Sequence, residues 1–63
     1  MMSVKTRNSL LVLQALVNKI RIEAERMDSA RLIASFEHDC NSLQMTIDNA
    51  DMIVASGERV HNV

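Results

Sequence analysis

The chain has no proline, tryptophan or tyrosine, and among its 63 residues it has one glycine, one phenylalanine and one cysteine. This scarcity argues against a β protein, because strands favour aromatic and β-branched residues and are separated by turn-forming residues. Helix formers such as alanine, leucine, methionine, arginine and glutamate are common instead. We therefore expect a single all-α domain.

The single cysteine excludes an intramolecular disulfide. A chain of this length buries only about 60% of the surface that its unfolded form exposes, so it usually needs a cross-link, a metal or another subunit. A lone thiol is typical of a reducing compartment, which predicts a cytoplasmic protein. The apolar run at residues 10–17 is far shorter than the ~20 residues of a membrane span. Self-association is the remaining route to stability, and we expect it.

Apolar residues recur at alternating steps of three and four along two stretches, which is the pattern of a helix with one buried seam. The first stretch predicts a helix over about residues 9–27 with the seam Leu10, Leu13, Val17, Ile20, Ala24 and Met27. The second predicts a helix over about residues 29–56 with the seam Ile33, Phe36, Cys40, Leu43, Ile47, Ala50 and Val54. The two seams are out of phase, so we expect the chain to turn between them.

The expected turn lies at Met27-Asp28-Ser29, where either of the last two residues can cap the second helix. A short connection makes the helices antiparallel neighbours. A single bent helix is the alternative, and a second break near Asn41-Ser42 is also open. Ser56-Gly57 predicts the end of the second helix and leaves residues 57–63 as a loose tail.

The start of the first helix depends on its cap. Asn8 and Ser9 are the candidate N-caps, with Ser3 as an earlier option. Lys5 and Arg7 would oppose the helix dipole in a first turn, so they favour the later start.

Charge is divided between the two halves of the chain, although the net charge is only −1. Residues 1–31 hold six cationic side chains against three carboxylates, and residues 32–63 hold one against five. We interpret this as two helices of opposite sign lying side by side. The alternative interpretation is a basic helix that binds phosphate.

The chain has more apolar residues than two buried helix seams require. Seven of the eight residues from Leu10 to Val17 are apolar, and Met52–Ala55 is similar. In an antiparallel hairpin these segments would lie together at the open end, where something should cover them. A second copy, giving a four-helix bundle, is the simplest cover. The candidate core and dimer residues are Leu10, Leu13, Val17, Ile20, Phe36, Leu43 and Ile47.

Apolar side chains also occupy outward positions. His38, Met45 and Met52 fall on the outermost heptad position of the second helix, and Ile22 takes the same position in the first. A methionine stripe can adapt to a protein partner, although exposed methionines can also be without function. The candidate partner-binding residues are Leu11, Leu16, Met45, Met52 and Ile53.

No motif predicts catalysis, a metal or a cofactor. His38 and Cys40 are two apart, which places them on different sides of a helix, and no four zinc ligands occur at accepted spacing. Cys40 falls on a seam position, where a small buried residue is expected. One glycine is too few for a phosphate-binding loop. We therefore expect a non-enzymatic protein that binds no cofactor.

RNA or DNA binding is the alternative to a protein partner. The polar residues Arg7, Gln14, Asn18 and Arg21 follow one another along the first helix and could contact phosphate and ribose in a dimer. In size and architecture the expected dimer of hairpins resembles the plasmid copy-number regulators, a resemblance that implies binding to paired RNA loops. The net charge and the lack of an aromatic on that face argue against this alternative.

We therefore hypothesise a small cytoplasmic regulatory or adaptor protein of bacterial or phage type. It would form a homodimer and bind a protein target through a helical surface, by helix-in-groove contact. A nucleic-acid-binding dimer and a structural subunit of a larger helical assembly are the alternatives. We expect no association with a membrane.

Overall fold

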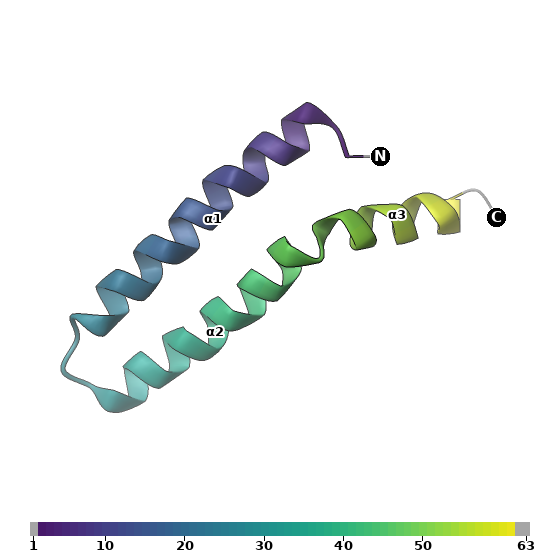
Figure 1. Cartoon of the computed structure of the whole chain (residues 1–63). Helices are drawn as coiled ribbons and strands as arrows, with labels where there is room; N and C mark the ends of the chain where they lie inside the picture. Colours follow the sequence, from purple (N-terminus) through teal and green to yellow (C-terminus); the bar gives the residue numbers. More distant parts are fainter. Residues whose placement is uncertain (1, 62–63) are drawn as a thin grey trace.

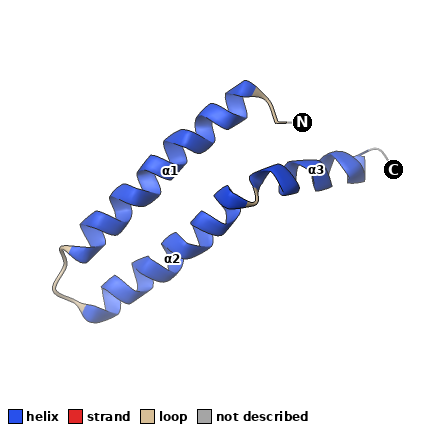
Figure 2. Cartoon of the chain, in the orientation of Figure 1, coloured by secondary structure: helices blue, strands red, loops and turns tan. Residues whose placement is uncertain are grey.

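The computed structural model describes residues 2–61, and it describes the side chains of residues 2–57. Three helices follow one another: α1 (Val4–Glu25), α2 (Ala30–Asp48) and α3 (Ala50–His61). α1 and α2 lie side by side and antiparallel, and α3 continues from the end of α2 (Figure 1). Only short non-helical segments separate the helices (Figure 2). The predicted all-α fold with an antiparallel hairpin is confirmed.

The first helix begins at Val4, because Ser3 supplies its N-cap. The Ser3 side chain accepts a hydrogen bond from the backbone N–H of Thr6 at 3.1 Å. A serine cap stabilises a helix by about 1 kcal/mol. Each exposed cation in the first turn costs about 0.3–1 kcal/mol against the dipole at low ionic strength, and salt screens this cost. The helix begins at the serine cap despite these charges, and the later start expected at residues 8–9 is wrong.

The chain reverses direction at the turn that the sequence predicted. α1 ends at Glu25, and the C-cap Arg26 donates its N–H to the carbonyl of Glu23 at 3.2 Å. Ser29 then caps α2 by accepting a hydrogen bond from the N–H of Leu32 at 3.2 Å. Ser29 is one of the two caps expected, and the reversal excludes a single bent helix.

A bend at Asn49 separates α2 from α3. Asn49 has φ −101° and ψ 11°, and its side-chain amide donates to the carbonyl of Met45 at 2.8 Å. The hydroxyls of Ser42 and Thr46 also donate to carbonyls four residues earlier, both at 3.3 Å. Such bonds compete with the helical ladder and often bend a helix. The expected continuous helix over residues 29–56 is therefore wrong.

The structure also excludes one alternative and differs from one further boundary expectation. α2 passes through residues 41–42 without a break. α3 passes through Gly57, which has no positive φ, and ends at His61. The expected loose tail is thus helical from residue 57 to residue 61, and residues 62–63 lie outside the described part of the chain.

The hairpin is one helix layer thick. The whole chain, with α3, measures 50 × 21 × 11 Å, and its radius of gyration is 14.9 Å, against about 10.6 Å for a compact domain of this length. The buried side chains of the described residues are Val17, Ala24 and Cys40. Domains normally enclose a core between two layers. This chain alone has only a strip of core along the contact between α1 and α2.

Candidate interaction surfaces

Each of the helices α1 and α2 is rotated about its own axis relative to the expected seams, so that partly different residues face the other helix. Val17 is buried in the contact between them, and Leu10 and Ile47 are half-buried. The remaining four expected core residues are 36% to 48% exposed, and they are Leu13, Ile20, Phe36 and Leu43. These four side chains are therefore not the core of the single hairpin.

Polar side chains take their place along one edge of the contact, and we call Gln14, Arg21, Asn41 and Gln44 the polar edge. Gln14 and Gln44 exchange two amide hydrogen bonds of 2.7 Å each. Arg21 donates to the amide oxygen of Asn41 at 2.9 Å. Because each of these groups finds a partner, it can lie against the other helix without losing hydrogen bonds. This pairing is the physical reason for the rotation.

Several of the exposed apolar residues gather on the other side of the hairpin. A groove of about 330 Å³ is lined by Leu16, Lys19, Ile20, Glu23, Ala24, Met27 and Phe36. Leu13 lies seven residues before Ile20, and Leu43 lies seven after Phe36, so both continue this side along the hairpin. We call these six side chains the apolar face: Leu13, Leu16, Ile20, Met27, Phe36 and Leu43.

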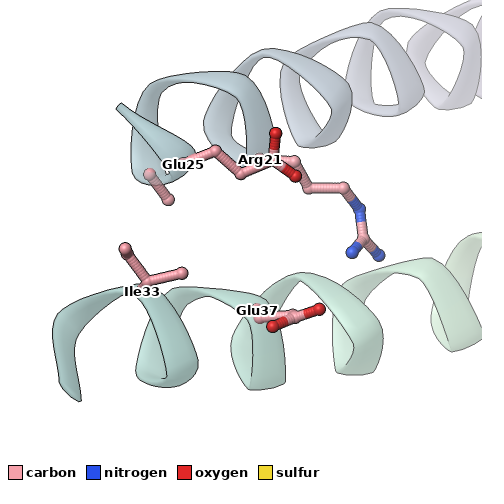
Figure 3. Close-up of a pocket in the computed structure, with 5 residues that line it drawn as sticks. Arg21, Glu25, Ile33 and Glu37 are labelled. Carbon is pink, nitrogen blue, oxygen red and sulfur yellow. The ribbon is translucent and has the colours of Figure 1, made fainter. Parts of the chain in front are cut away.

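The groove on the polar side is much smaller. It holds about 40 Å³ and is lined by Arg21, Ala24, Glu25, Ile33 and Glu37. Figure 3 shows Arg21 extending from α1 toward α2, where Glu37 lies opposite, with Ile33 nearer the turn. A site for a small-molecule substrate is usually about 300 Å³ or larger. This groove therefore has room for water but not for a substrate.

The expected partner-binding residues are exposed, but they do not share one surface. Leu16 belongs to the apolar face, whereas Leu11 lines a different groove at the open end of the hairpin. Met45 lies on α2, and Met52 and Ile53 lie on α3 beyond the bend. Leu11 and Leu16 are also about 140° apart around α1.

The two apolar segments that were expected together at the open end do not pack against each other. Within the described residues, α1 packs along α2, and α3 is in contact with α2 alone. The bend at Asn49 directs Met52–Ala55 away from Leu10–Val17. The expectation of a joint apolar patch there is wrong. The methionine stripe is divided by the same bend, since His38 and Met45 lie before it and Met52 after it.

The candidate nucleic-acid residues are partly used by the hairpin itself. Gln14 and Arg21 bond to α2 in the polar edge, and Gln14 also donates to Asn18 at 3.2 Å. Arg7 and Asn18 are exposed. Two carboxylates line the groove beside Arg21, so a phosphate on this side would meet charges of both signs.

The described residues contain no cluster of three or more histidine, cysteine, aspartate or glutamate side chains that could hold a metal. Cys40 is buried and His38 is exposed, so the two side chains point apart. Within the same part of the chain, no helix is both long enough and apolar enough to cross a bilayer.

Comparison with known proteins returns no matching family model, no matching curated protein and no matching solved structure.

Proposed function

We propose that this chain is a non-enzymatic helical interaction protein that works as a homodimer. Two hairpins would pack their apolar faces together and form a four-helix bundle. The apolar face carries this proposal, because it puts six large apolar side chains on one side of a layer 11 Å thick. Contiguous apolar patches of this kind mark interaction sites. A second hairpin supplies the missing second layer of a two-layer fold.

The exposed surface area is large enough for a second hairpin to pack against this one. The chain exposes 5358 Å². A compact monomer of 7.1 kDa exposes about 4,100 Å². The excess of about 1,300 Å² is more than the roughly 800 Å² that each partner buries in a standard interface. The hairpin therefore has enough uncovered surface for a stable dimer.

Charge at the border of the apolar face also fits a second copy. Lys19 and Glu23 lie one turn apart on α1 and line the groove together. A two-fold axis that lies in the interface, perpendicular to α1 and level with the midpoint between these two residues, would make the two α1 helices antiparallel. Each lysine would then face the glutamate of the other copy, so the same border is self-complementary.

In this proposal the dimer is a regulatory or adaptor protein of the cytoplasm, where its single thiol stays reduced. It acts by holding a protein target on a helical surface that dimerisation leaves free. The nucleic-acid alternative is less well supported, because two of its four residues are already bonded within the polar edge.

Ile20 and Ile22 provide a matched pair of variants that test the dimer. Both are exposed isoleucines of α1, but they lie about 160° apart around the helix, and only Ile20 lines the apolar groove. Ile20→Gln should weaken self-association by at least about tenfold in sedimentation velocity, because a polar amide is desolvated at the interface. Ile22→Gln should leave association unchanged. Equal effects of the two substitutions would refute the proposed interface.

The alternative that the chain is a structural subunit of a larger helical assembly predicts a different result. Such a chain would be disordered alone, whereas the proposed dimer is helical at micromolar concentration. Circular dichroism of the isolated protein distinguishes the two.

A further inference from the structure

A second helix-packing surface runs along the solvent side of α1. Its residues follow steps of four, three, four, three and four, which is the spacing of a coiled-coil seam. We call this surface the outer seam, and it consists of Val4, Asn8, Leu11, Ala15, Asn18 and Ile22. All six residues are exposed. The three largest side chains are 76%, 67% and 59% exposed at Val4, Leu11 and Ile22.

The outer seam is separate from both contacts already described. The contact with α2 buries Val17 and Ala24, and the apolar face uses Leu16 and Ile20. Ala15 lies about 100° around the helix from Leu16 and about 160° from Val17. A dimer formed through the apolar face would therefore leave the outer seam exposed.

Cations border the outer seam, and carboxylates are missing from its length. Between Val4 and Ile22 the helix has four cationic residues and no aspartate or glutamate. Lys5 and Lys19 lie along one border, two heptads apart, and Arg7 and Arg21 lie along the other at the same spacing. Lys5 and Arg7 are near the helix N-terminus, where the dipole favours negative charge. This end of α1 therefore attracts anionic groups.

We propose that the outer seam binds an acidic amphipathic helix of a partner protein. The apolar side chains would pack against the apolar stripe of that helix, and carboxylates beside the stripe would lie against the exposed cations Lys5 and Arg7. Lys19 borders the apolar face and Arg21 is bonded to Asn41, so neither is needed for this contact. The two asparagines would fix the register of the pair, as single buried polar residues do in coiled coils. The seam spans an arc of only about 80° and lacks an aromatic residue, which suits one helix better than a membrane surface.

Synthetic peptides test the proposal with the whole protein. The probe is a fluorescein-labelled peptide of three heptads with leucine at positions a and d and glutamate at e and g. Its control has lysine at e and g. Fluorescence anisotropy should show that the acidic peptide binds at least about tenfold more tightly than the basic one. Added salt should reduce this difference, because the charged groups lie near the surface.

Leu11→Gln and Met45→Gln are the matched variants, because the two side chains are 67% and 65% exposed and only Leu11 lies in the outer seam. Leu11→Gln should weaken binding of the acidic peptide by about tenfold or more. Met45→Gln should not change it. Lys5→Gln, at an exposed position outside the apolar face, should weaken binding severalfold without affecting the fold.

Several outcomes would overturn the proposal. They are equal binding of the acidic and basic peptides, no binding at about 100 µM protein, and equal losses in the two matched variants. Binding to phosphatidylserine vesicles that Leu11→Gln abolishes, without peptide binding, would assign the surface to lipid. Circular dichroism and sedimentation of Leu11→Gln, which should match the unsubstituted protein, show that a loss is local. Because Leu11 is outside the apolar face, this proposal and the dimer can fail independently.

Discussion

Gln14 of α1 and Gln44 of α2 exchange two side-chain hydrogen bonds of 2.7 Å each across the hairpin. Gln44 also donates to Asp48 at 2.9 Å. Because the pair is part-buried, sliding one helix past the other would break both bonds between the helices, each worth about 1 kcal/mol, and would leave each amide only its bond within its own helix. The pair therefore sets the register of α1 against α2.

Replacement of one glutamine should cost more than replacement of both. Gln14→Leu should lower the free energy of unfolding by about 1 kcal/mol, because the Gln44 amide loses both of its bonds to Gln14. The double variant Gln14→Leu/Gln44→Leu should recover most of that loss, since two leucines can pack where two amides were paired. Urea denaturation of the two single variants, the double variant and the unsubstituted protein measures the coupling. Strictly additive effects would show that the two amides do not interact.

The hairpin could be predicted from the sequence, because periodicity and capping are local properties. The serine at position 29 caps α2 as expected, and the two apolar periods are out of phase, as a turn requires. The rotation of α1 could not be predicted. Leu10, Val17 and Ala24 fit both the expected seam and the observed one, so apolar spacing does not choose between them.

The polar edge was missed for a related reason. From the sequence of the first helix alone, Gln14 belongs to a solvent-facing polar face. That helix considered by itself gives no sign that a side chain of the second helix bonds to Gln14. A signal was available, since Gln14 and Arg21 are seven residues apart, as are Glu37 and Gln44. Such spacing marks two polar rows that an antiparallel pair can bring together. This spacing would have indicated Gln44 as a side chain of the contact, but it gives no indication of Asn41.

The bend at Asn49 was missed because the apolar period continues through it. Ala50 and Val54 extend the seam of α2, and both are half-buried. The sequence feature that favours a bend is a set of polar side chains. Ser42, Thr46 and Asn49 can each bond to a carbonyl four residues earlier. All three bonds are present in the structure.

Loss of the α2 cap should destabilise the hairpin measurably. Ser29→Ala should lower the free energy of unfolding by about 1 kcal/mol, because the N–H of Leu32 loses its acceptor. Ser35→Ala is the control, since Ser35 is exposed within α2, where alanine is the better helix former. Thermal denaturation followed by circular dichroism compares the two. A control as unstable as Ser29→Ala would contradict the assignment of the cap.

The thiol of Cys40 should react only when the hairpin opens. Cys40 is 0% exposed and is the only cysteine in the chain, so its reaction with a thiol reagent reports on this position alone. In native buffer the rate should be at least about 100-fold lower than in concentrated urea, because labelling requires an opening that costs several kcal/mol. A native rate close to the rate in urea would mean that the contact between α1 and α2 is not formed.

The mass of the protein in solution tests the central claim most directly. Sedimentation equilibrium at micromolar concentration should give twice the 7.1 kDa mass of the chain. Dilution should convert this species to the single chain, with a parallel loss of helix, because one layer alone buries little apolar surface. A mass of 7.1 kDa at all concentrations, with a cooperative thermal transition that does not depend on concentration, would contradict the dimer through the apolar face.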